Sequence, residues 1–401
     1  MDISRINFIS NSNISKKTVL LRVDLNLPFE KDKVTDNLRI DRILETINLL
    51  QERKCKVIII SHLGRPLGKI DKNFSLLRTL KPLSDKLRNQ NIKFSNDCIG
   101  QEAINTVKEL NFGEICLFEN LRFYKEEEMN DITFAKKLSK LGDIFVNEAF
   151  SCCHRKHSSI VSIPKFLPSF AGVGLQKEIT KISEVLETPK RPLMVIIGGS
   201  KISTKINTLL NIVKKADTIA IGGAMANTFL AAQNFEIGNS LSEKNMIKNA
   251  LEIIKIAKKN KCELILPSDV ITANRLEHGS KTKMFDVKEV PNDEMIFDIG
   301  EKSISYLISK IKISKSLLWN GPLGAFEFEP FDFSTTKISQ EVAKLTSQNK
   351  ILSVAGGGDT VAALTKAKVK NEFSYLSTAG GAFLEWLDGK ELPGILALRK
   401  A

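Results

Sequence analysis

The chain alternates short runs of β-branched and aliphatic residues with longer segments whose apolar residues recur at helical spacing. In the first half, four apolar runs are predicted to be strands, at residues 19–26, 56–62, 114–120 and 144–150. Segment 40–53, between the first two runs, has the period of an amphipathic helix. Alternation of this kind is typical of βαβ units, so it predicts a parallel sheet covered by helices.

The second half repeats this pattern. Its predicted strands are residues 192–199, 218–223, 262–267, 295–300, 316–322, 351–357 and 373–378. Several of these runs are continuously apolar, as expected of strands that carry helices on both faces. A helical stretch that starts at Gly174 and is closed by Pro189 and Pro192 lies between the halves.

We therefore predict an α/β protein of two doubly wound parallel-sheet (Rossmann-like) domains, joined by a helix, with a ligand cleft between them. The predicted N-terminal domain is 1–173, the joining helix 174–190 and the C-terminal domain 191–385. We expect the last segment, 386–401, to pack back on the N-terminal domain.

Ligands of open α/β sheets bind beyond the carboxyl ends of the strands. In the first half these ends carry polar and basic residues: Arg22, Asp24, Asn26, His62, Arg65, Asn120, Arg122, Asn147 and, slightly later, Arg155. In the second half they carry glycines: Gly198, Gly199, Gly222, Gly223, Gly321, Gly324, Gly356, Gly357, Gly358, Gly380 and Gly381. The first set suits a small, multiply charged anion, and the second lets backbone approach a larger phosphorylated ligand.

Each feature taken alone has an ordinary interpretation. A strand-end arginine is usually a surface ion pair, and a Gly-Gly pair is usually a tight turn. Asp359 either caps the helix that follows it or holds a metal bound to phosphates. Lys201 and Lys205 are predicted to lie on one face at the start of a helix, where they are either exposed lysines or cations that need an anion. The coincidence of basic residues on four strand ends favours the ligand interpretation.

Composition narrows the choice of class. The chain has 401 residues, 42% of them hydrophobic and 26% charged, which excludes wholesale disorder. It has no apolar run of membrane-spanning length, no secretory signal pattern and no Cys-x-x-Cys pair among its 6 cysteines. These features predict a soluble, cytoplasmic protein.

The formal net charge of +13 comes largely from scattered lysines. No basic block is interleaved with aromatic residues, so we expect neither a nucleic-acid nor a membrane partner. A Walker A motif, a Gly-x-Gly-x-x-Gly fingerprint and the protein-kinase motifs are absent from the sequence. Cys152 to His157 superficially resembles a zinc cluster, but adjacent cysteines do not easily share one tetrahedral site. A dinucleotide-dependent dehydrogenase and a nucleic-acid-binding protein remain the rival classes.

The chain resembles the phosphoglycerate kinase family over essentially its whole length. The motifs that carry this resemblance occur in the family's order: RVDLNLP, DNLRI, SHLGRP, FENLRF, VNEAF with HRKH, GGSKISTK, LWNGPLGAFE, GGGDT and STAGGAFLEWLDGKELPG. The resemblance implies phosphoryl transfer between 1,3-bisphosphoglycerate and ADP, giving 3-phosphoglycerate and ATP with Mg²⁺ as cofactor. It also implies a glycolytic, hinge-bending enzyme, which we expect to be a monomer.

The resemblance also implies roles for individual residues. Phosphoglycerate binding is implied for Arg22, Asp24, Leu25, Asn26, Arg39, His62, Leu63, Gly64, Arg65, Arg122, His154 and Arg155. Nucleotide binding is implied for Lys201, Lys205, Gly223, Asn320, Glu327, Gly357, Gly358, Asp359 and Thr360, with Asp359 as the metal contact. Catalytic roles are implied for Arg39, Lys205, Gly358 and Gly381.

The sequence departs from the usual family pattern at three places. Ser151, Cys152 and Cys153 stand where the family usually has Gly-Thr-Ala, and Glu148 replaces an aspartate. Ala379 replaces a glycine of the STGGG loop. A methyl group at that position could crowd a backbone that approaches the transferring phosphoryl group, and we expect the change to be tolerated.

Overall fold

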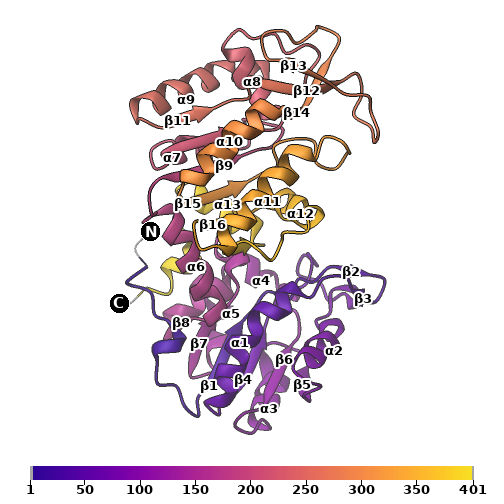
Figure 1. Ribbon diagram of the computed structural model, residues 1–401. Helices are drawn as coiled ribbons and strands as arrows, with labels where there is room; N and C mark the ends of the chain where they lie inside the picture. The colour runs from indigo at the N-terminus through magenta and orange to yellow at the C-terminus, as the bar shows by residue number, and fades with distance from the viewer. Residues whose placement is uncertain (1–2, 400–401) are drawn as a thin grey trace. The chain divides into compact units, whose positions relative to one another are not determined.

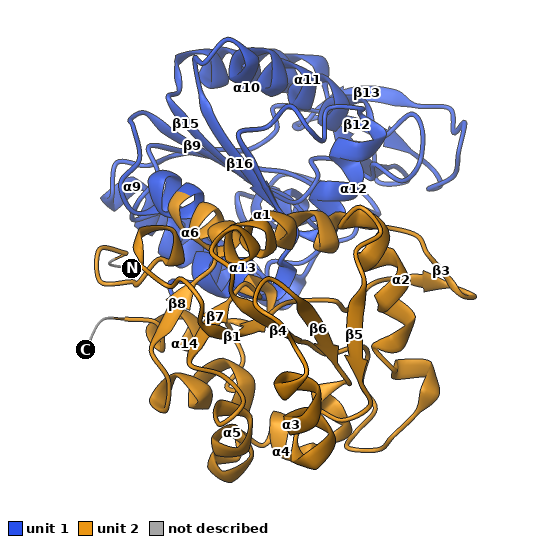
Figure 2. Cartoon of the chain, turned by 90° about the horizontal axis from the view of Figure 1, so that it is seen from below, with its two compact units in different colours: residues 1, 181–390 blue, residues 2–180, 391–401 orange. Residues whose placement is uncertain are grey.

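The computed structural model describes residues 3–399, which divide into two compact units (Figure 2). Of the described residues, 3–180 and 391–399 form unit 2, and 181–390 form unit 1. The division falls inside helix α6 (Val173–Leu186), the helix predicted between the halves. No helix among residues 3–399 is long and apolar enough to cross a membrane.

Unit 2 is built on a six-stranded parallel sheet (Figure 1). Its strand order is β5 (Ile92–Ser95), β6 (Ile115–Phe118), β4 (Lys56–Ile60), β1 (Thr18–Arg22), β7 (Ile144–Asn147) and β8 (Ser169–Ala171). Each neighbouring pair is parallel. The four predicted strands of the first half are the central, adjacent strands of this sheet, and their buried apolar side chains form its core.

Unit 1 has a second six-stranded parallel sheet. Its order is β11 (Glu263–Ile265), β10 (Thr218–Ile221), β9 (Leu193–Ile197), β15 (Ser316–Asn320), β16 (Leu352–Gly356) and β17 (Tyr375–Ser377). All five neighbouring pairs are parallel, as the continuous apolar runs indicate. The doubly wound α/β class is therefore confirmed for both halves.

One predicted strand belongs elsewhere. Residues 295–300 were expected in the parallel sheet, but β14 (Met295–Ile299) pairs antiparallel with β12 (Asp269–Ala273), which also pairs with β13 (Lys283–Asp286). This small sheet packs its own apolar cluster, which includes Leu230 and Val270. A buried apolar run has the same sequence pattern in either sheet, so its pattern alone could not separate them.

Helices connect the strands and cover the sheets (Figure 1). In α1, buried Ile40, Ile43, Ile47 and Leu50 recur at helical spacing and place one face against β4. The α-helices of unit 2 are α1 (Leu38–Glu52), α2 (Leu77–Lys86), α3 (Gly100–Lys108), α4 (Lys125–Glu128), α5 (Ile132–Ser139) and α14 (Pro393–Leu396). Those of unit 1 are α7 (Ile206–Ile212), α8 (Ala224–Ala232), α9 (Ile247–Lys259), α10 (Glu301–Ile313), α11 (Phe333–Ser347), α12 (Gly358–Lys366) and α13 (Gly380–Leu387).

The remaining elements are short. Strands β2 (Phe29–Glu30) and β3 (Lys33–Val34) form a two-stranded hairpin. A single π-helical turn, η5 (Ser158–Ser162), follows the end of β7. The 3₁₀ turns are η1 (Ile9–Asn11), η2 (Lys72–Phe74), η3 (Leu121–Phe123), η4 (Phe150–Cys152), η6 (Ile163–Lys165) and η7 (Lys244–Met246).

The segment after residue 390 packs on unit 2. The Gly394 amide donates to the Cys153 carbonyl at 2.9 Å, and the Asn7 amide donates to the Leu398 carbonyl at 3.2 Å. Gly394 permits this approach, because a Cβ there would lie 2.9 Å from the Cys153 Cα. Residues far apart in sequence thus complete one compact body.

Candidate active site

Four adjacent strands of unit 2 bring the predicted basic residues together. Strands β6, β4, β1 and β7 are neighbours in the sheet, and all are parallel, so their carboxyl ends meet at one edge. The segments that leave this edge carry Arg122, His62, Asp24 and Arg155 respectively. This explains why residues spread over more than a hundred positions form one cluster, which we call the basic cluster: Arg22, Asp24, Asn26, Arg39, His62, Arg65, Arg122, His154 and Arg155.

Asp24 organises one side of the basic cluster. Its Oδ1 accepts from Arg39 Nη1 at 2.9 Å and from the Asn26 amide at 3.0 Å, and Ser151 donates its hydroxyl to Oδ2. Burial raises the pKa of Asp24, but the Arg39 guanidinium and the hydrogen bonds from Ser151 and Asn26 outweigh burial and lower it to about 2. Asp24 is therefore ionised, and it holds the guanidinium of Arg39, whose side chain is 33% exposed.

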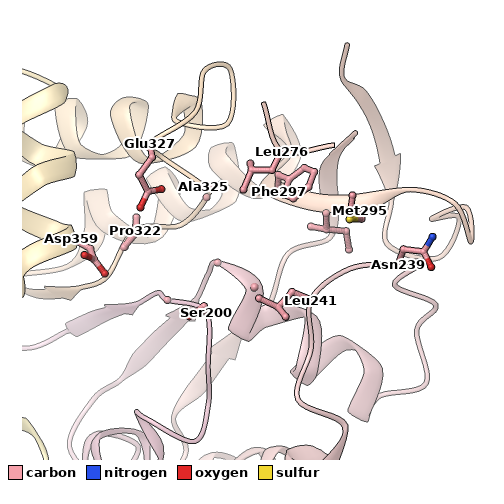
Figure 3. Close-up of a pocket in the computed structure, with 15 residues that line it drawn as sticks. Ser200, Asn239, Leu241, Leu276, Met295, Phe297, Pro322, Ala325, Glu327 and Asp359 are labelled. Carbon is pink, nitrogen blue, oxygen red and sulfur yellow. The ribbon is translucent and has the colours of Figure 1, made fainter. Parts of the chain in front are cut away.

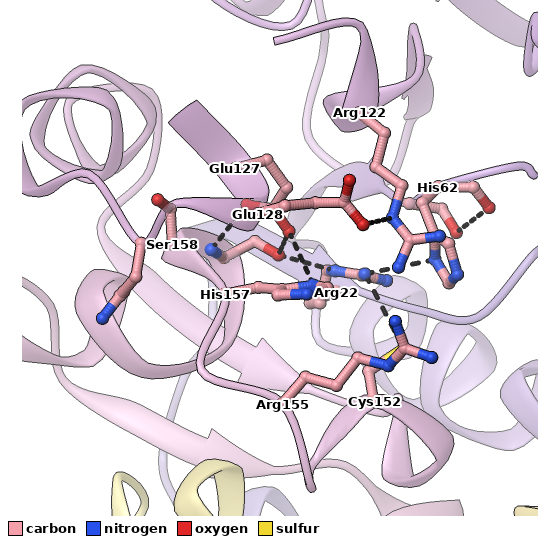
Figure 4. A network of polar contacts seen from close by, with 12 residues as sticks. Arg22, His62, Arg122, Glu127, Glu128, Cys152, Arg155, His157 and Ser158 are labelled. Carbon is pink, nitrogen blue, oxygen red and sulfur yellow. Dashed lines mark hydrogen bonds and ion pairs between the residues drawn. The ribbon is translucent and has the colours of Figure 1, made fainter. Parts of the chain in front are cut away.

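Arg22 lies beneath the rest of the cluster. Its side chain is fully buried, and its donors face protein groups (Figure 4). Nε donates to Ser159 Oγ at 2.8 Å, Nη1 donates to the Val23 carbonyl, and Nη2 lies 3.3 Å from His62 Nδ1. Arg22 therefore supports its neighbours. A ligand contact was predicted for Arg22, but its side chain has no exposed atom with which to make one.

Two histidines of this region are held neutral. Burial and the Arg22 guanidinium lower the pKa of His62 well below its usual value, and Asp24 only partly opposes them. Burial, Arg122 and Arg22 lower the pKa of His157 to about 3. Both imidazoles are therefore uncharged at neutral pH, and the positive charge of the cluster comes from its arginines.

Arg122 is fixed by backbone and by one carboxylate. It lies in η3, its Nη1 donates to the Gly64 carbonyl at 2.7 Å, and its Nε lies 3.2 Å from Glu128 Oε1. Gly64 has a φ of 61°, and a Cβ there would overlap the Phe74 ring. Glycine is thus required where this loop turns below the arginine.

The remaining predicted residues of the cluster differ in access. Arg65 is exposed, and the Arg155 Nε donates to His154 Nε2 at 3.2 Å. Leu25 and Leu63 have buried side chains, so only their backbone could face a ligand. The Leu25 amide donates to Ser61 Oγ and the Leu63 carbonyl accepts from Asn120 Nδ2, so these backbone groups position neighbouring loops.

Unit 1 contains a cavity of about 510 Å³ (Figure 3). The Glu327 and Asp359 carboxylates lie toward one end, and apolar side chains including Leu276 and Phe297 line the other. Three of the predicted nucleotide residues line it: Gly223, Glu327 and Asp359. The other lining residues are Gly199, Ser200, Ala224, Asn239, Leu241, Leu276, Met295, Ile296, Phe297, Pro322, Gly324 and Ala325.

Glycine allows backbone segments to approach closely beside this cavity. Gly223 has a φ of 65°, and a Cβ there would lie 2.6 Å from the Gly199 carbonyl oxygen. Gly357, with a φ of 102°, precedes α12, and a Cβ there would lie 2.7 Å from Asn320 Nδ2. Small residues at these turns were predicted, and close backbone packing is their physical reason.

Asn320 and Thr360 fix the turn that opens α12. Asn320 Nδ2 donates to the Gly356 carbonyl at 2.7 Å, and the Gly321 amide donates to Thr360 Oγ1 at 2.7 Å. Both residues are buried, so they hold the turn while Gly358 and Asp359 are exposed at the helix N-terminus. Such a terminus presents unpaired amides and a favourable dipole to an anion.

The prediction that Lys201 and Lys205 lie in a helix is wrong. Lys201 and Lys205 were expected on one face at the start of a helix, but α7 begins at Ile206 and both residues lie in the preceding turn. Glu243 fixes this turn by accepting from the Ser203 amide and hydroxyl. Lys201 is exposed, whereas Lys205 is partly buried and donates its ammonium to Asn320 Oδ1. Burial lowers the pKa of Lys205, and Asp359 and Asp388 oppose this shift.

The altered glycine loop accommodates its alanine. Ala379 precedes α13 with a φ of −90°, a conformation open to any L-residue, and its side chain is buried. Gly381 is exposed in the first turn of α13, and a Cβ at Gly380 would meet open space. The Ala379 methyl group therefore imposes no backbone strain.

The residues present fit Mg²⁺ only together with a phosphorylated ligand. No group of three or more His, Cys, Asp or Glu residues within 3–399 could hold a metal by itself. Asp359 supplies a carboxylate at the N-terminus of α12, beside the cavity. Mg²⁺ typically binds one or two carboxylates, several waters and substrate phosphates, so this donor set suits a magnesium–nucleotide complex.

Several residues of these sites escaped sequence reasoning. Glu127 belongs to a run of acidic residues that resembles an exposed helix, yet it is fully buried. Ser151 and Ser159 are ordinary polar residues in sequence, yet they bind Asp24 and Arg22. The apolar cavity wall comes from strand β14 and from loops, and no periodicity marks it as a site.

Residues 3–399 thus form a two-unit α/β protein, with the basic cluster on one unit and a cavity of about 510 Å³ on the other. The sequence model of the family described as phosphoglycerate kinase matches residues 9–390. Phosphoglycerate kinase of Methylorubrum extorquens (strain PA1) is 48% identical over 383 residues, covering 96% of each chain. That of Bartonella quintana (strain Toulouse) is 44% identical over 393 residues, covering 98% of this chain and 99% of its own.

Solved structures agree. The structure of phosphoglycerate kinase from Coxiella burnetii has a TM-score of 0.91 and 39% identity, covering 98% of each chain. That from Pyrococcus horikoshii OT3 has a TM-score of 0.80 and 29% identity, with the same coverage. The chain belongs to the phosphoglycerate kinase family. It is a glycolytic kinase, a phosphotransferase with a carboxyl group as acceptor.

Proposed function

We propose that this chain catalyses the reversible, Mg²⁺-dependent transfer of a phosphoryl group from 1,3-bisphosphoglycerate to ADP, giving 3-phosphoglycerate and ATP. The basic cluster of unit 2 binds the phosphoglycerate, and the cavity of unit 1 binds the nucleotide. The observation that carries this proposal is the chemical difference between the two sites. One offers guanidinium groups to a small anion, and the other offers an apolar chamber edged by glycine turns and carboxylates.

In the basic cluster, each predicted residue has a proposed task. Arg65, Arg122 and Arg155 bind the phosphate and carboxylate of phosphoglycerate, because the guanidinium fork matches both groups. The remaining polar contacts come from Asp24, Asn26, His62 and His154, and backbone contacts come from Leu25, Leu63 and Gly64. Arg22 is buried and acts by positioning its neighbours. Support comes from the fixed geometry of Arg122 and Asp24.

In the cavity, the apolar end suits the nucleotide base and Glu327 suits the ribose hydroxyls. Gly223 lies at the cavity wall, and Lys201 and Lys205 face the phosphates. The α12 N-terminus, with Gly357, Gly358, Asp359 and Thr360, holds the terminal phosphates, and Asn320 fixes that turn. Asp359 would hold Mg²⁺, which when bound neutralises charge on the phosphate oxygens.

The chemistry requires no general base. The attacking atom is a carboxylate oxygen or an ADP phosphate oxygen, and neither carries a proton that must be removed. Catalysis therefore depends on positioning and on neutralising charge at the transferring group. Arg39 from unit 2, Lys205 from unit 1 and the amides of Gly358 and Gly381 are the groups we propose for that neutralisation.

We also propose that the enzyme is a cytoplasmic monomer without a membrane or nucleic-acid partner. All 6 cysteines are unpaired thiols, which suits a reducing compartment. Both proposed sites are built from residues of a single chain, so turnover needs no second copy.

The test is an assay of the purified chain in which ADP formation from ATP is coupled to a chromogenic reaction. Activity should require 3-phosphoglycerate, ATP and Mg²⁺ together, and should disappear with EDTA or with glycerate as the acceptor. Phosphoglycerate-independent ATP hydrolysis at the same rate would contradict the proposal. Nicotinamide reduction or salt-sensitive nucleic-acid binding would instead support a rival class.

A further inference from the structure

Behind the basic cluster, a buried carboxylate is linked to a buried guanidinium through a serine. Ser159, in η5, donates its hydroxyl to Glu127 Oε1 at 2.5 Å and its amide to Glu127 Oε2 at 2.9 Å. The same hydroxyl oxygen accepts from Arg22 Nε at 2.8 Å. Glu127 and Arg22 are both fully buried, so each charge balances the other across one hydroxyl group (Figure 4).

The other end of Arg22 reaches a ring nitrogen of His62. Arg22 Nη2 lies 3.3 Å from His62 Nδ1. A guanidinium can only donate hydrogen bonds, so Nδ1 must be the acceptor and cannot carry the proton. In a neutral imidazole the proton then resides on Nε2. Among residues 3–399, His62 Nε2 has no hydrogen-bond partner, and this atom is not fully buried.

We propose that Glu127, Ser159 and Arg22 form a positioning chain that fixes His62 as the neutral Nε2–H tautomer, so that this N–H donates to the anionic ligand of the basic cluster. None of the three touches the ligand in this scheme, and each acts through the next. The chain gives His62 a donor with a single orientation, whereas a free imidazole would exchange between two tautomers.

The groups around His62 agree with this assignment. Arg22, Arg122 and Arg39 are the cations that face it, and Asp24 is the anion. Burial and the cations together lower the pKa of His62, so the ring remains neutral. A neutral His62 can donate a hydrogen bond without adding a positive charge, which the neighbouring arginines would repel.

Histidine NMR tests the chain directly, because the protein has only 4 histidines. Two-bond ¹H–¹⁵N spectra of the ¹⁵N-histidine-labelled enzyme at neutral pH distinguish the two neutral tautomers and the imidazolium. A His62→Gln variant assigns the signal. We expect the Nε2–H pattern in the wild-type enzyme, without any ligand added.

Two variants of Ser159 then probe the link. Ser159→Ala removes the hydroxyl between Glu127 and Arg22 and should give His62 a mixture of tautomers, whereas Ser159→Thr keeps a hydroxyl and should keep the Nε2–H pattern. Glu128→Gln is the matched control, because Glu128 contacts Arg122 and not Arg22. It should leave the His62 spectrum unchanged. Circular dichroism checks that each variant is folded.

The outcomes are decisive even if one variant fails to fold. An Nδ1–H or imidazolium pattern in the wild-type enzyme overturns the proposal, as does an unchanged Nε2–H pattern in folded Ser159→Ala. Loss of the pattern in Ser159→Ala with retention in Ser159→Thr and Glu128→Gln supports it.

A kinetic measurement, which rests on the proposed function, separates the positioning chain from the role of His62 in binding phosphoglycerate. If His62 donates to phosphoglycerate, Ser159→Ala should raise the phosphoglycerate KM about 10-fold while leaving the nucleotide KM unchanged. A tautomer change without a KM change would support the positioning chain and contradict the ligand role of His62. The spectrum thus tests the chain independently of the reaction.

Discussion

Lys205 is a partly buried ammonium, and its charge is opposed by burial and favoured by Asp359 and Asp388. We predict that Lys205→Ala lowers kcat roughly 100- to 1000-fold, because it removes one preorganised protein charge that stabilises the transferring group. Steady-state kinetics with both substrates saturating measures this. Lys214→Ala, at an exposed lysine of the same unit, is the control and should retain full activity. Normal kcat in folded Lys205→Ala would remove this residue from the catalytic set.

Asp359 has two possible tasks that one substitution separates. If it holds Mg²⁺ with the nucleotide phosphates, Asp359→Asn should raise the Mg²⁺ concentration for half-maximal rate by about 10-fold or more. If it only interacts with the dipole of α12, in whose first turn it lies, the variant should lose about 1 kcal/mol of unfolding free energy or less, with an unchanged Mg²⁺ requirement. A Mg²⁺ titration of the rate, beside urea unfolding of both proteins, distinguishes these results.

Single residues also show where sequence reasoning stops. Asp24, His62 and Arg122 could be found because each follows an apolar run that ends at the ligand edge. Glu127 could not, because burial of one carboxylate in an acidic run depends on η5, which folds over it and has no sequence pattern of its own. Likewise, Arg22 has the same pattern as its neighbours, and only its side-chain packing shows that it is enclosed.

Among the elements, the loop that carries Glu327 is held by one lysine. Lys366, in the last turn of α12, donates to the Phe326 carbonyl at 3.0 Å and contacts Asp332 at 3.1 Å and Glu329 at 3.5 Å. We predict that Lys366→Met raises the nucleotide KM about 10-fold with little change in the phosphoglycerate KM, because Glu327 loses its fixed position.

Lys344→Met on α11 provides the comparison for this loop. Lys344 is exposed, and its ammonium has no ion pair among the described residues. Its replacement should therefore leave both KM values as they are. Equal effects on both KM values in Lys366→Met would indicate general destabilisation instead of a displaced loop.

Helix α6 begins on a buried glutamate that titrates near neutrality. Glu148 accepts from Thr46 Oγ1 at 2.8 Å and from the Gly174 and Leu175 amides at 2.6 and 3.1 Å. Burial raises its pKa to about 7, although these donors lower it. The folded state therefore binds more protons than the unfolded state between pH 4.5 and about 7, and the contribution of Glu148 to stability falls as pH rises through this window.

Replacement by glutamine tests that sign. Glu148→Gln cannot ionise, so the wild-type stability advantage over it should shrink from about pH 5 to about pH 8, by at most about 3 kcal/mol. Urea unfolding of both proteins across this range measures the difference. Asp298, whose pKa burial also raises to about 7, is present in both proteins and cancels in the comparison. A constant difference would show that Glu148 is ionised throughout.

The elements themselves were predictable to different extents. Long parallel strands appear as continuous apolar runs, and α1 and α6 as periodic segments, so both sheets could be expected. The turn before α7 could not be predicted. It is fixed by a hydrogen bond from Ser203 to Glu243, and the helical spacing of Lys201 and Lys205 contains no information about that contact. The antiparallel sheet of β12, β13 and β14 depends on pairing between segments far apart, which local pattern does not contain.

At the scale of the whole molecule, the two proposed substrates bind to different units. In-line transfer requires the reacting atoms about 3–3.5 Å apart. We therefore predict that the units close on each other during turnover, with the hinge near α6 and the prolines that follow it. Solution scattering of the free enzyme, each binary complex and the ternary complex with a non-reacting nucleotide measures this. The radius of gyration should be smallest with both ligands.

Four superimposable scattering profiles would contradict that prediction and indicate a preformed arrangement. A decrease with one ligand alone, equal to that of the ternary complex, would show that a single substrate drives closure. The comparison also bears on water exclusion, since closing protects an acyl phosphate from hydrolysis.

The return of residues 391–399 to unit 2 has a consequence for biosynthesis. Ribosomes make residues 3–180 first, yet Leu392, Gly394 and Ile395, which are buried in that body, are made only after all of unit 1. Domains usually fold from the N-terminus onward during translation. In this chain the first body to be translated is the last to be completed, and the Cys153 region that receives Gly394 stays uncovered until unit 1 has been translated.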